Sequence, residues 1–212
     1  MHVYNNRNVY RAEEKVVCML SADAILVHRC QEDDVEAFDE IVARYKDGVY
    51  NYIWRMISNR DDVEDLTIEV FVRAFSCIKN FRRESNLRTW LYRIATNLCI
   101  DKYRRASLEK QFCISLDAER EDDDGPSKPM ELPDETYDPQ RVFERVELQS
   151  EIQRALAALP EKLRAAMILY DIEGMSYEDI AEALECPVGT VKSRLFNARM
   201  QLRTLLKPYV EA

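Results

Sequence analysis

An acidic, proline-containing segment divides this chain into two blocks, and it limits the possible folds more strongly than any other feature. Between Ser107 and Gln140, eleven acidic residues stand against three basic ones, which gives a net charge of −8. One glycine and three prolines interrupt residues 107–138, and no helical or strand-like repeat of apolar residues survives there. Such a segment cannot bury enough apolar surface to fold, so we expect residues 107–139 to form a flexible linker.

Both flanking blocks carry apolar residues at helical spacing. The stretch that follows Asp61 places these on one face: Val63, Leu66, Val70, Ala74 and Ile78. The chain has only four glycines, and the alternation of apolar and polar residues that is typical of strands is scarce. We therefore predict an all-α fold of two small helical domains, at residues 21–106 and 140–212, after an extension at residues 1–20. We also predict Asp61 as the N-cap of one helix and a helix end near Arg105.

Composition and charge exclude several classes of function. The net charge is −9 and 47% of the residues are hydrophobic, as in ordinary globular proteins. The apolar stretch Val16–Leu20 is too short for a signal-peptide core or a membrane span, so we expect a cytoplasmic protein. Six scattered cysteines and two histidines do not suggest a metal site, and we expect most of the thiols to be buried. Because phosphate loops and nucleophile motifs are absent too, we expect no enzyme, no cofactor and no small-molecule substrate.

The first block ends in a strongly basic segment, Lys79–Arg105, in which eight basic residues face two acidic ones. One face of the helix that starts near Leu87 combines an aromatic ring, two cations and an amide: Trp90, Arg93, Asn97 and Arg104. Aromatic rings stack on unpaired bases while cations follow the backbone, so this face suits a DNA strand. The preceding loop can hold an extruded base, and it contains Phe81, Arg82, Arg83 and Ser85. Trp90 fits an ordinary core position equally well.

The second block contains the pattern of a helix-turn-helix. Ser176 and Asp179 predict the N-cap of a short helix, and a turn at residues 185–187 separates it from a longer basic helix. The longer helix has an apolar face made of Val191, Leu195, Ala198 and Leu202. Small and polar residues at its start permit close approach to base edges, and its cations reach phosphates and purine acceptors. The simpler alternative is a solvated basic helix in an ordinary bundle.

The helix that follows Asp61 has the opposite charge. Its acidic residues lie along one side, and they are Asp61, Asp62, Asp65 and Glu69. An acidic face does not bind phosphates. It is either a solvated surface whose N-terminal acids are favoured by the helix dipole, or a docking surface for a basic partner protein.

At these positions the sequence resembles bacterial RNA polymerase sigma factors of the sigma-70 family, in the extracytoplasmic function (ECF) class. Asp62–Phe75 resembles the helix that binds core polymerase. Three segments resemble the minus-ten recognition region of the family: Phe81–Arg82, Leu87–Asn97 and Asp101–Arg105. Two further segments resemble sigma domain 4: Ala158–Arg164 and Gly189–Leu195. The resemblance covers about residues 22–206 and implies sigma domain 2 in the first block and sigma domain 4 in the second.

The resemblance implies a role for each surface in promoter-specific transcription initiation. Contacts to the beta-prime clamp helices of core RNA polymerase are implied for Asp62, Asp65, Leu66, Glu69, Val70 and Phe71. Contacts to minus-ten promoter DNA are implied for Phe81, Arg82, Arg83, Ser85, Arg88, Trp90, Arg93, Asn97, Lys102, Arg104 and Arg105. Contacts to minus-thirty-five DNA are implied for Gly189, Thr190, Lys192, Ser193, Arg194, Asn197 and Arg199. The beta flap of the polymerase and an anti-sigma factor, in a stress or envelope response, complete the implied partners.

Three features depart from the family pattern, and one rival hypothesis stays open. Ile68 stands where the family helix usually has glutamine, the first twenty or so residues have no recognised family counterpart, and the linker is long for the class. A stand-alone helix-turn-helix regulator that binds DNA as a dimer would explain the second block. It would leave the basic segment Lys79–Arg105 without a role.

Overall fold

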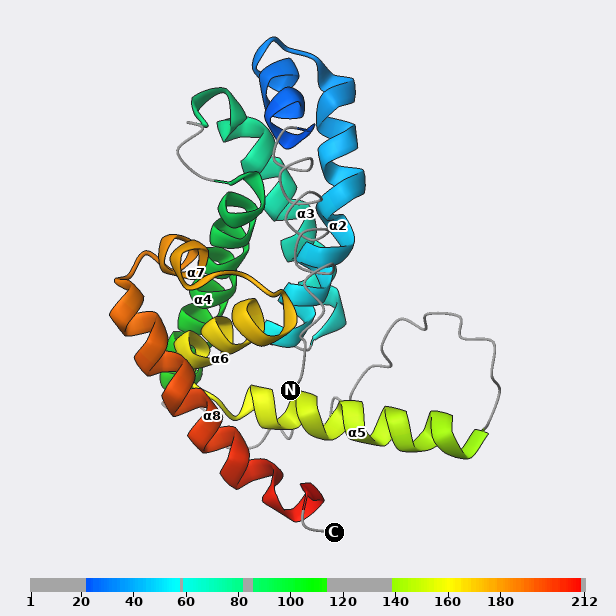
Figure 1. The fold of residues 1–212 in the computed structure, drawn as a ribbon, viewed down its shortest axis with the longest axis vertical. Helices are drawn as coiled ribbons and strands as arrows, with labels where there is room; N and C mark the ends of the chain where they lie inside the picture. The colour runs from blue at the N-terminus through cyan, green and yellow to red at the C-terminus, as the bar shows by residue number, and fades with distance from the viewer. Residues whose placement is uncertain (1–21, 58, 82–85, 114–138, 211–212) are drawn as a thin grey trace, which may run out of the picture.

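The computed structural model describes residues 22–57, 59–81, 86–113 and 139–210 of the chain. Within these residues every regular element is helical and no strand is present, so the predicted all-α fold is confirmed. In the first part, a helix at residues 22–31 precedes α2 (Val35–Ile57), α3 (Arg60–Cys77), the short 3₁₀ helix η1 (Ile78–Asn80) and α4 (Leu87–Cys113) (Figure 1). The second part contains α5 (Pro139–Ala157), α6 (Glu161–Met167), the π-helical turn η2 (Ile168–Ile172), α7 (Tyr177–Ala183) and α8 (Val188–Val210).

Two predicted helix boundaries in the first part are wrong. The N-cap of α3 is Asn59, whose side-chain oxygen accepts a hydrogen bond from the backbone N–H of Asp62 at 3.1 Å. The helix therefore begins before Asp61, because asparagine caps a helix as well as aspartate does. α4 continues past Arg105 to Cys113, since residues 106–113 contain neither glycine nor proline to stop it. The predicted linker thus loses its first residues to a helix, and residues 114–138 lie outside the described part.

The helix-turn-helix of the second part forms as predicted. Ser176 caps α7 by accepting a hydrogen bond from the backbone N–H of Asp179 at 3.0 Å. Glu185, in the turn before α8, has a positive φ of 48°. The predicted apolar face of α8 is buried throughout: Val191, Leu195, Ala198 and Leu202.

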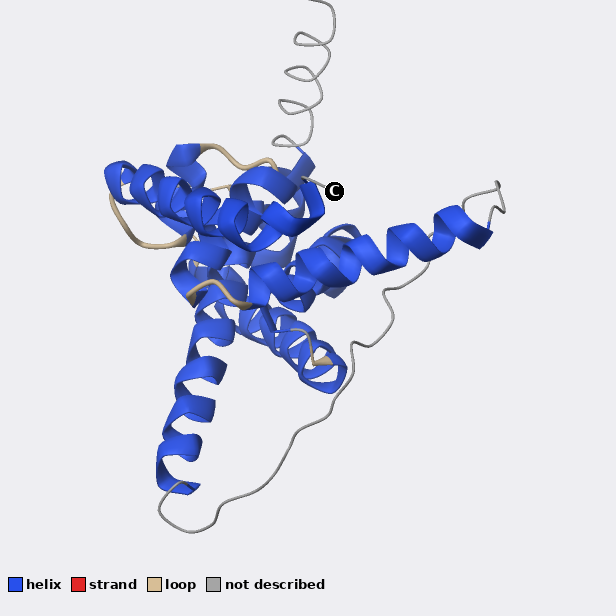
Figure 2. Ribbon diagram, turned by 90° about the horizontal axis from the view of Figure 1, so that it is seen from below, coloured by secondary structure: helices blue, strands red, loops and turns tan. Residues whose placement is uncertain are grey.

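The two helical parts pack against each other and share one hydrophobic core. α7 lies across α4, while α2 contacts both α5 and α6 (Figure 1). α8 runs along the outer side of this body, and the ends of α4 and α5 that border residues 114–138 extend away from it (Figure 2). The sequence predicts the two parts but contains no signal for their contact. That contact decides which candidate site residues are accessible.

Candidate nucleic-acid and polymerase interface

The first turns of α8 present the predicted minus-thirty-five surface to solvent. Gly189, Lys192, Ser193, Asn197 and Arg199 are exposed there, whereas Thr190 and Arg194 are half-buried. A side chain added at Gly189 would meet no atom within 4 Å, so a ligand can approach the backbone closely at this point. All seven predicted residues therefore lie on or beside the outward face of the helix. The structure brings them together as the sequence predicts.

Two cations on this surface are supported by a pair of stacked tyrosines. The rings of Tyr170 and Tyr177 lie 4.9 Å apart, with an angle of 12° between their planes. Lys192 sits 5.6 Å from the centre of the Tyr177 ring, and Arg199 sits 5.2 Å from that of Tyr170. Arg199 also donates to Asp171 at 3.0 Å, and this carboxylate is the first cause of the raised pKa of Arg199. The Tyr177 ring limits the rotamers of Lys192, and the Tyr170 ring and the Asp171 carboxylate limit those of Arg199.

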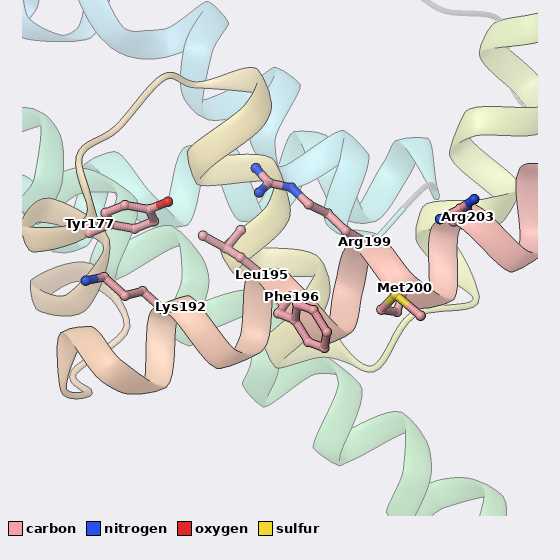
Figure 3. A pocket seen from close by; sticks show the side chains of 7 residues that line it. All are labelled: Tyr177, Lys192, Leu195, Phe196, Arg199, Met200 and Arg203. Atoms are coloured by element: carbon pink, nitrogen blue, oxygen red, sulfur yellow. The ribbon is translucent and has the colours of Figure 1, made fainter.

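Phe196 belongs to the same surface and was missing from the predicted contacts. Its side chain is 66% exposed, which is unusual for phenylalanine. Figure 3 shows it beside a hollow that Tyr177, Lys192, Arg199, Met200 and Arg203 also line. The sequence signal was available, because a helical wheel places Phe196 opposite the apolar face of α8.

Trp90 is not a surface residue, so the prediction that it offers its ring to DNA is wrong for this structure. It is 7% exposed and packs on Phe81, with 4.8 Å between the ring centres. Phe81 itself is held by Gln31, which donates to the Phe81 carbonyl at 3.0 Å. The sequence fits a core position for Trp90 equally well, and Trp90 occupies that core position. Arg82, Arg83 and Ser85 lie outside the described residues.

The other predicted minus-ten residues differ in exposure and in their ion pairs, and Arg104 lies 3.5 Å from the Asp101 carboxylate. Asn97, Arg104 and Arg105 are exposed, and Arg93 is half-buried. Lys102 donates to Asp62 at 2.6 Å, so a predicted DNA contact and a predicted polymerase contact neutralise each other. Neither side chain is fully available to a partner while this ion pair stands.

Arg88 is engaged by the second part of the chain. Its Nη2 atom donates to the backbone carbonyl of Glu173 at 2.7 Å and to Oε2 of Glu173 at 3.0 Å. Tyr92 donates its hydroxyl to the same carboxylate, and Thr89 donates to Asp179 at 3.2 Å. Burial, followed by the hydrogen bond to Glu173, raises the pKa of the Tyr92 hydroxyl. Burial alone would lower the pKa of Arg88, but Tyr92 and Glu173 outweigh it and the net shift is upward.

Arg164 of α6 makes a second contact between the two parts. The residue is 4% exposed, and its guanidinium donates to the carbonyl of Met56 and to the hydroxyl of Tyr103 in the first part. It also donates to the carbonyls of Ala157 and Leu159, at 2.6 and 2.9 Å, while its Nε has no hydrogen-bond partner. All acceptors in these hydrogen bonds are neutral, and the guanidinium also lies 5.1 Å from the centre of the Tyr103 ring.

The predicted polymerase-docking side of α3 needs a correction. Leu66, Val70 and Phe71 are buried in the core, so they cannot contact a partner in this structure. Asp65 is exposed, and Glu69 pairs with Arg73 at 2.5 Å. The exposed apolar residues lie instead on the opposite face and were missed: Ile68, Val72 and Phe75. Their spacing is itself helical, so the signal was a second apolar stripe on one helix.

The described cysteines differ in surroundings. Cys30 and Cys99 are buried, and burial raises the pKa of both thiols, that of Cys99 to about 12. Cys77 is exposed, and Cys186 is half-buried where Arg194 approaches its sulfur at 3.5 Å. Among the described helices, none combines the length and the apolar character that crossing a membrane requires.

Comparison with known proteins identifies the family. Family models for Sigma-70 region 2 and Sigma-70 region 4 match residues 41–109 and 149–202. The RNA polymerase sigma-H factor of Pseudomonas aeruginosa is 36% identical over 190 residues, which cover 88% of this chain and 94% of that protein. The ECF RNA polymerase sigma-E factor of Haemophilus influenzae is 37% identical over 193 residues, with coverages of 88% and 96%.

A solved structure shows the same fold. The sigma factor RpoE from Bartonella quintana, in a co-crystal with the anti-sigma factor NepR, matches with a TM-score of 0.61 and 26% sequence identity. The match covers 80% of this chain and 96% of that one. Two sigma regions match in the expected order, and relatives of similar length are more than 30% identical. These matches exclude the hypothesis of a stand-alone regulator. The chain belongs to the ECF class of RNA polymerase sigma factors and directs transcription as an alternative sigma factor.

Proposed function

We propose that this sigma factor docks on core RNA polymerase through the exposed side of α3 and reads promoter DNA with α8 and α4. The observation that carries the proposal is the separation of three surfaces on one chain. α8 presents exposed cations and small polar residues, α4 presents Asn97 and two arginines, and α3 presents acids beside apolar side chains. We assign sigma domain 2 to residues 21–106 and sigma domain 4 to residues 140–212.

The α3 surface suits a helical partner with basic and apolar residues. Ile68 is 64% exposed and Val72 is 58% exposed, with Asp65 nearby on the same helix. Burying such a stripe removes apolar surface from water, and the acids select a basic partner. The beta-prime clamp helices of core polymerase are the partner that the family resemblance implies. Ile68, which replaces the usual glutamine, would contribute apolar contact in place of a hydrogen bond.

The α8 surface suits the major groove of the minus-thirty-five duplex. Gly189 and Ser193 leave room for base edges, Arg194 and Asn197 supply hydrogen-bond donors, and Lys192 reaches phosphates. Arg199 joins Lys192 once its ion pair with Asp171 breaks. Phe196 adds an apolar contact of the kind that thymine methyl groups accept. The beta flap of the polymerase would hold this domain at the distance that the promoter sets.

On α4, we assign strand binding to the residues that stay exposed or polar at the surface. Asn97 offers an amide to an unpaired base, while Arg93, Arg104 and Arg105 follow the backbone. Arg88 joins them once its carboxylate partner leaves.

Control by an anti-sigma factor is suggested by the likeness to RpoE, whose solved structure is a complex with the anti-sigma factor NepR. We infer that this chain is held inactive by a partner of that kind. It would work in the cytoplasm, where polymerase and promoter DNA are found.

A division of labour between the two readers tests the proposal. Arg194→Ala should weaken binding of the minus-thirty-five duplex roughly tenfold, because one side chain that reads purine acceptors is worth about 1–3 kcal/mol. Asn97→Ala should leave duplex binding intact and slow strand opening. Footprinting of the holoenzyme measures the first effect, and permanganate reactivity of unpaired thymines measures the second.

Matched controls come from α2, where Lys46→Ala and Asn51→Ala remove an exposed cation and an exposed amide away from both readers. Neither control should change footprinting or opening. If Arg194→Ala and Asn97→Ala lose duplex binding equally, the proposed division between α8 and α4 is refuted.

A further inference from the structure

We propose that Gln31 is a positioning residue for minus-ten recognition, because its side-chain amide fixes the backbone at Phe81 and thereby the place of the Phe81 ring. The inference deepens the proposed function, and it rests on the minus-ten contact that the family resemblance implies for Phe81. Gln31 is the last residue of the helix at residues 22–31. It lies outside residues 41–109, which the family model for Sigma-70 region 2 matches.

The side chain of Gln31 makes two hydrogen bonds to backbone that is remote in the sequence. Its Nε2 atom donates to the carbonyl of Ile78 at 3.2 Å and to the carbonyl of Phe81 at 3.0 Å. Ile78 is the first residue of η1, and Phe81 directly follows η1. Because an amide nitrogen carries two N–H donors, one side chain satisfies both acceptors and holds both ends of this short helix.

The backbone that carries Gln31 is itself fixed by the turn that ends its helix. The N–H of Asp34 donates to the carbonyl of Arg29 at 3.1 Å. The N–H of Asp33, a residue with a φ of 67°, donates to the carbonyl of Cys30 at 3.2 Å. These two hydrogen bonds around a left-handed residue make a Schellman motif. The amide of Gln31 therefore reaches η1 from a turn of defined geometry.

A second contact joins this turn to η1, and it is the weaker one. Lys79 of η1 pairs with the carboxylate of Asp33 at 2.5 Å, and both side chains are exposed. An ion pair between exposed charges contributes little to stability. The polar attachment of η1 to the turn therefore depends mainly on the half-buried Gln31.

The anchored carbonyl belongs to the residue whose ring packs on Trp90. The ring centres of Phe81 and Trp90 lie 4.8 Å apart, with an angle of 47° between the planes. Phe81 is half-buried, so part of its side chain stays open to solvent and to a base. A ring that is held before binding loses less conformational freedom when a base stacks on it. Gln31 therefore contributes to strand binding through Phe81 and without a DNA contact of its own.

The test uses the full-length chain, alone and in the holoenzyme. Gln31→Met keeps the length of the side chain and removes the donor, while Gln31→Asn keeps the amide and shortens its reach. Gln31→Lys supplies a donor again. Gln153→Met is the matched control, because Gln153 is also half-buried and also donates to a backbone carbonyl, that of Trp54, at 2.9 Å. Circular dichroism confirms that each variant folds.

Tryptophan fluorescence reports the position of the Phe81 ring in the free chain. The chain has two tryptophans, so Trp54→Phe in every protein leaves Trp90 as the single emitter. We expect Gln31→Met and Gln31→Asn to increase the quenching of Trp90 by acrylamide, because Phe81 then covers its ring less firmly. Gln31→Lys and Gln153→Met should match the parent protein.

Strand opening is measured in the holoenzyme by permanganate reactivity, on a promoter fragment that gives a discrete transcription start with the wild type. Gln31→Met should slow opening roughly tenfold, the size of effect that the loss of two neutral hydrogen bonds predicts. Footprinting of the minus-thirty-five duplex should stay unchanged, and Gln31→Lys should restore opening. Phe81→Ala should slow opening by itself, and adding Gln31→Met to it should cause no further loss, because residues that act through one another are not additive.

Wild-type opening in Gln31→Met and Gln31→Asn, beside an impaired Phe81→Ala, would overturn the inference and leave the role of Phe81 intact. Unchanged quenching of Trp90 would overturn it as well. So would a further loss when Gln31→Met is added to Phe81→Ala, since Gln31 would then act by another route. If Phe81→Ala opens the promoter normally, the implied contact of Phe81 fails, and the positioning role of Gln31 fails with it.

Discussion

At the scale of single residues, ion pairs decide which cations are available to DNA. Arg88 and Lys102 each have a carboxylate partner, Glu173 and Asp62, within 3.0 Å. Asn97 faces solvent on the same helix, and Arg104 is exposed and lies 3.5 Å from the carboxylate of Asp101. Residues of α4 that look equivalent in charge therefore differ in how closely a carboxylate holds them.

Cys99 gives a residue-scale prediction about stability. It is fully buried, and burial raises the pKa of its thiol from 9.0 to about 12. As the pH rises above 9.0, the unfolded chain loses this proton while the folded chain keeps it. The free energy of unfolding should therefore fall with pH above the unfolded pKa. In Cys99→Ala this part of the fall is absent, which denaturant unfolding at about pH 8 and about pH 10 can measure.

Burial raises the pKa of Tyr52 too, and Cys99 is the second cause of that rise. The comparison therefore measures the Cys99 thiol together with its effect on Tyr52. An identical fall in both proteins would show that the Cys99 thiol ionises as readily in the folded chain as in water.

At the scale of elements, α4 is enclosed on more sides than a helical wheel can reveal. α2, α3 and α7 all pack against it. A helical wheel predicts one buried stripe, made of Leu87, Leu91, Ile94 and Leu98. The three leucines are buried, and Ile94 is half-buried. The wheel also assigns Trp90 to an exposed stripe, because the sequence does not show that Phe81 packs on that ring. The prediction of buried and exposed faces was more accurate for α8, because α8 lies at the edge of the body and keeps one face in water.

α7 is short, so its cap should matter for stability. Ser176→Ala removes the oxygen that accepts from the Asp179 N–H, and it also removes the hydroxyl that donates to the Asp179 carboxylate at 2.6 Å. Loss of such a cap costs about 1 kcal/mol of stability. We expect that decrease in the free energy of unfolding, measured by urea denaturation.

Ser76→Ala serves as the control for this prediction. Ser76 is exposed within α3 and donates to the carbonyl of Val72 in its own helix, so its loss should change stability by less than about 0.5 kcal/mol. Equal effects of the two substitutions would contradict a capping role for Ser176.

At the scale of the whole molecule, the order of helices follows from local patterns, and the arrangement of the two parts does not. Capping residues, apolar spacing and the helix-turn-helix turn are short-range signals, and they predict both helical parts. The contacts of Arg88 with Glu173 and of Arg164 with Met56 join residues that lie far apart in the chain. Nothing in a single sequence marks such pairs. The surfaces of the site were therefore predictable from the sequence. The ion pairs and hydrogen bonds that engage some of its residues were not.

Run-off transcription with purified core RNA polymerase on genomic DNA fragments tests whether this chain directs promoter-specific initiation. We expect discrete start sites that appear only when both core polymerase and this chain are present. A reaction without such sites, beside a sigma factor that is active under the same conditions, would contradict this role. Protection of symmetric DNA sites by the chain alone would contradict it equally, because it would point to a regulator that works without polymerase.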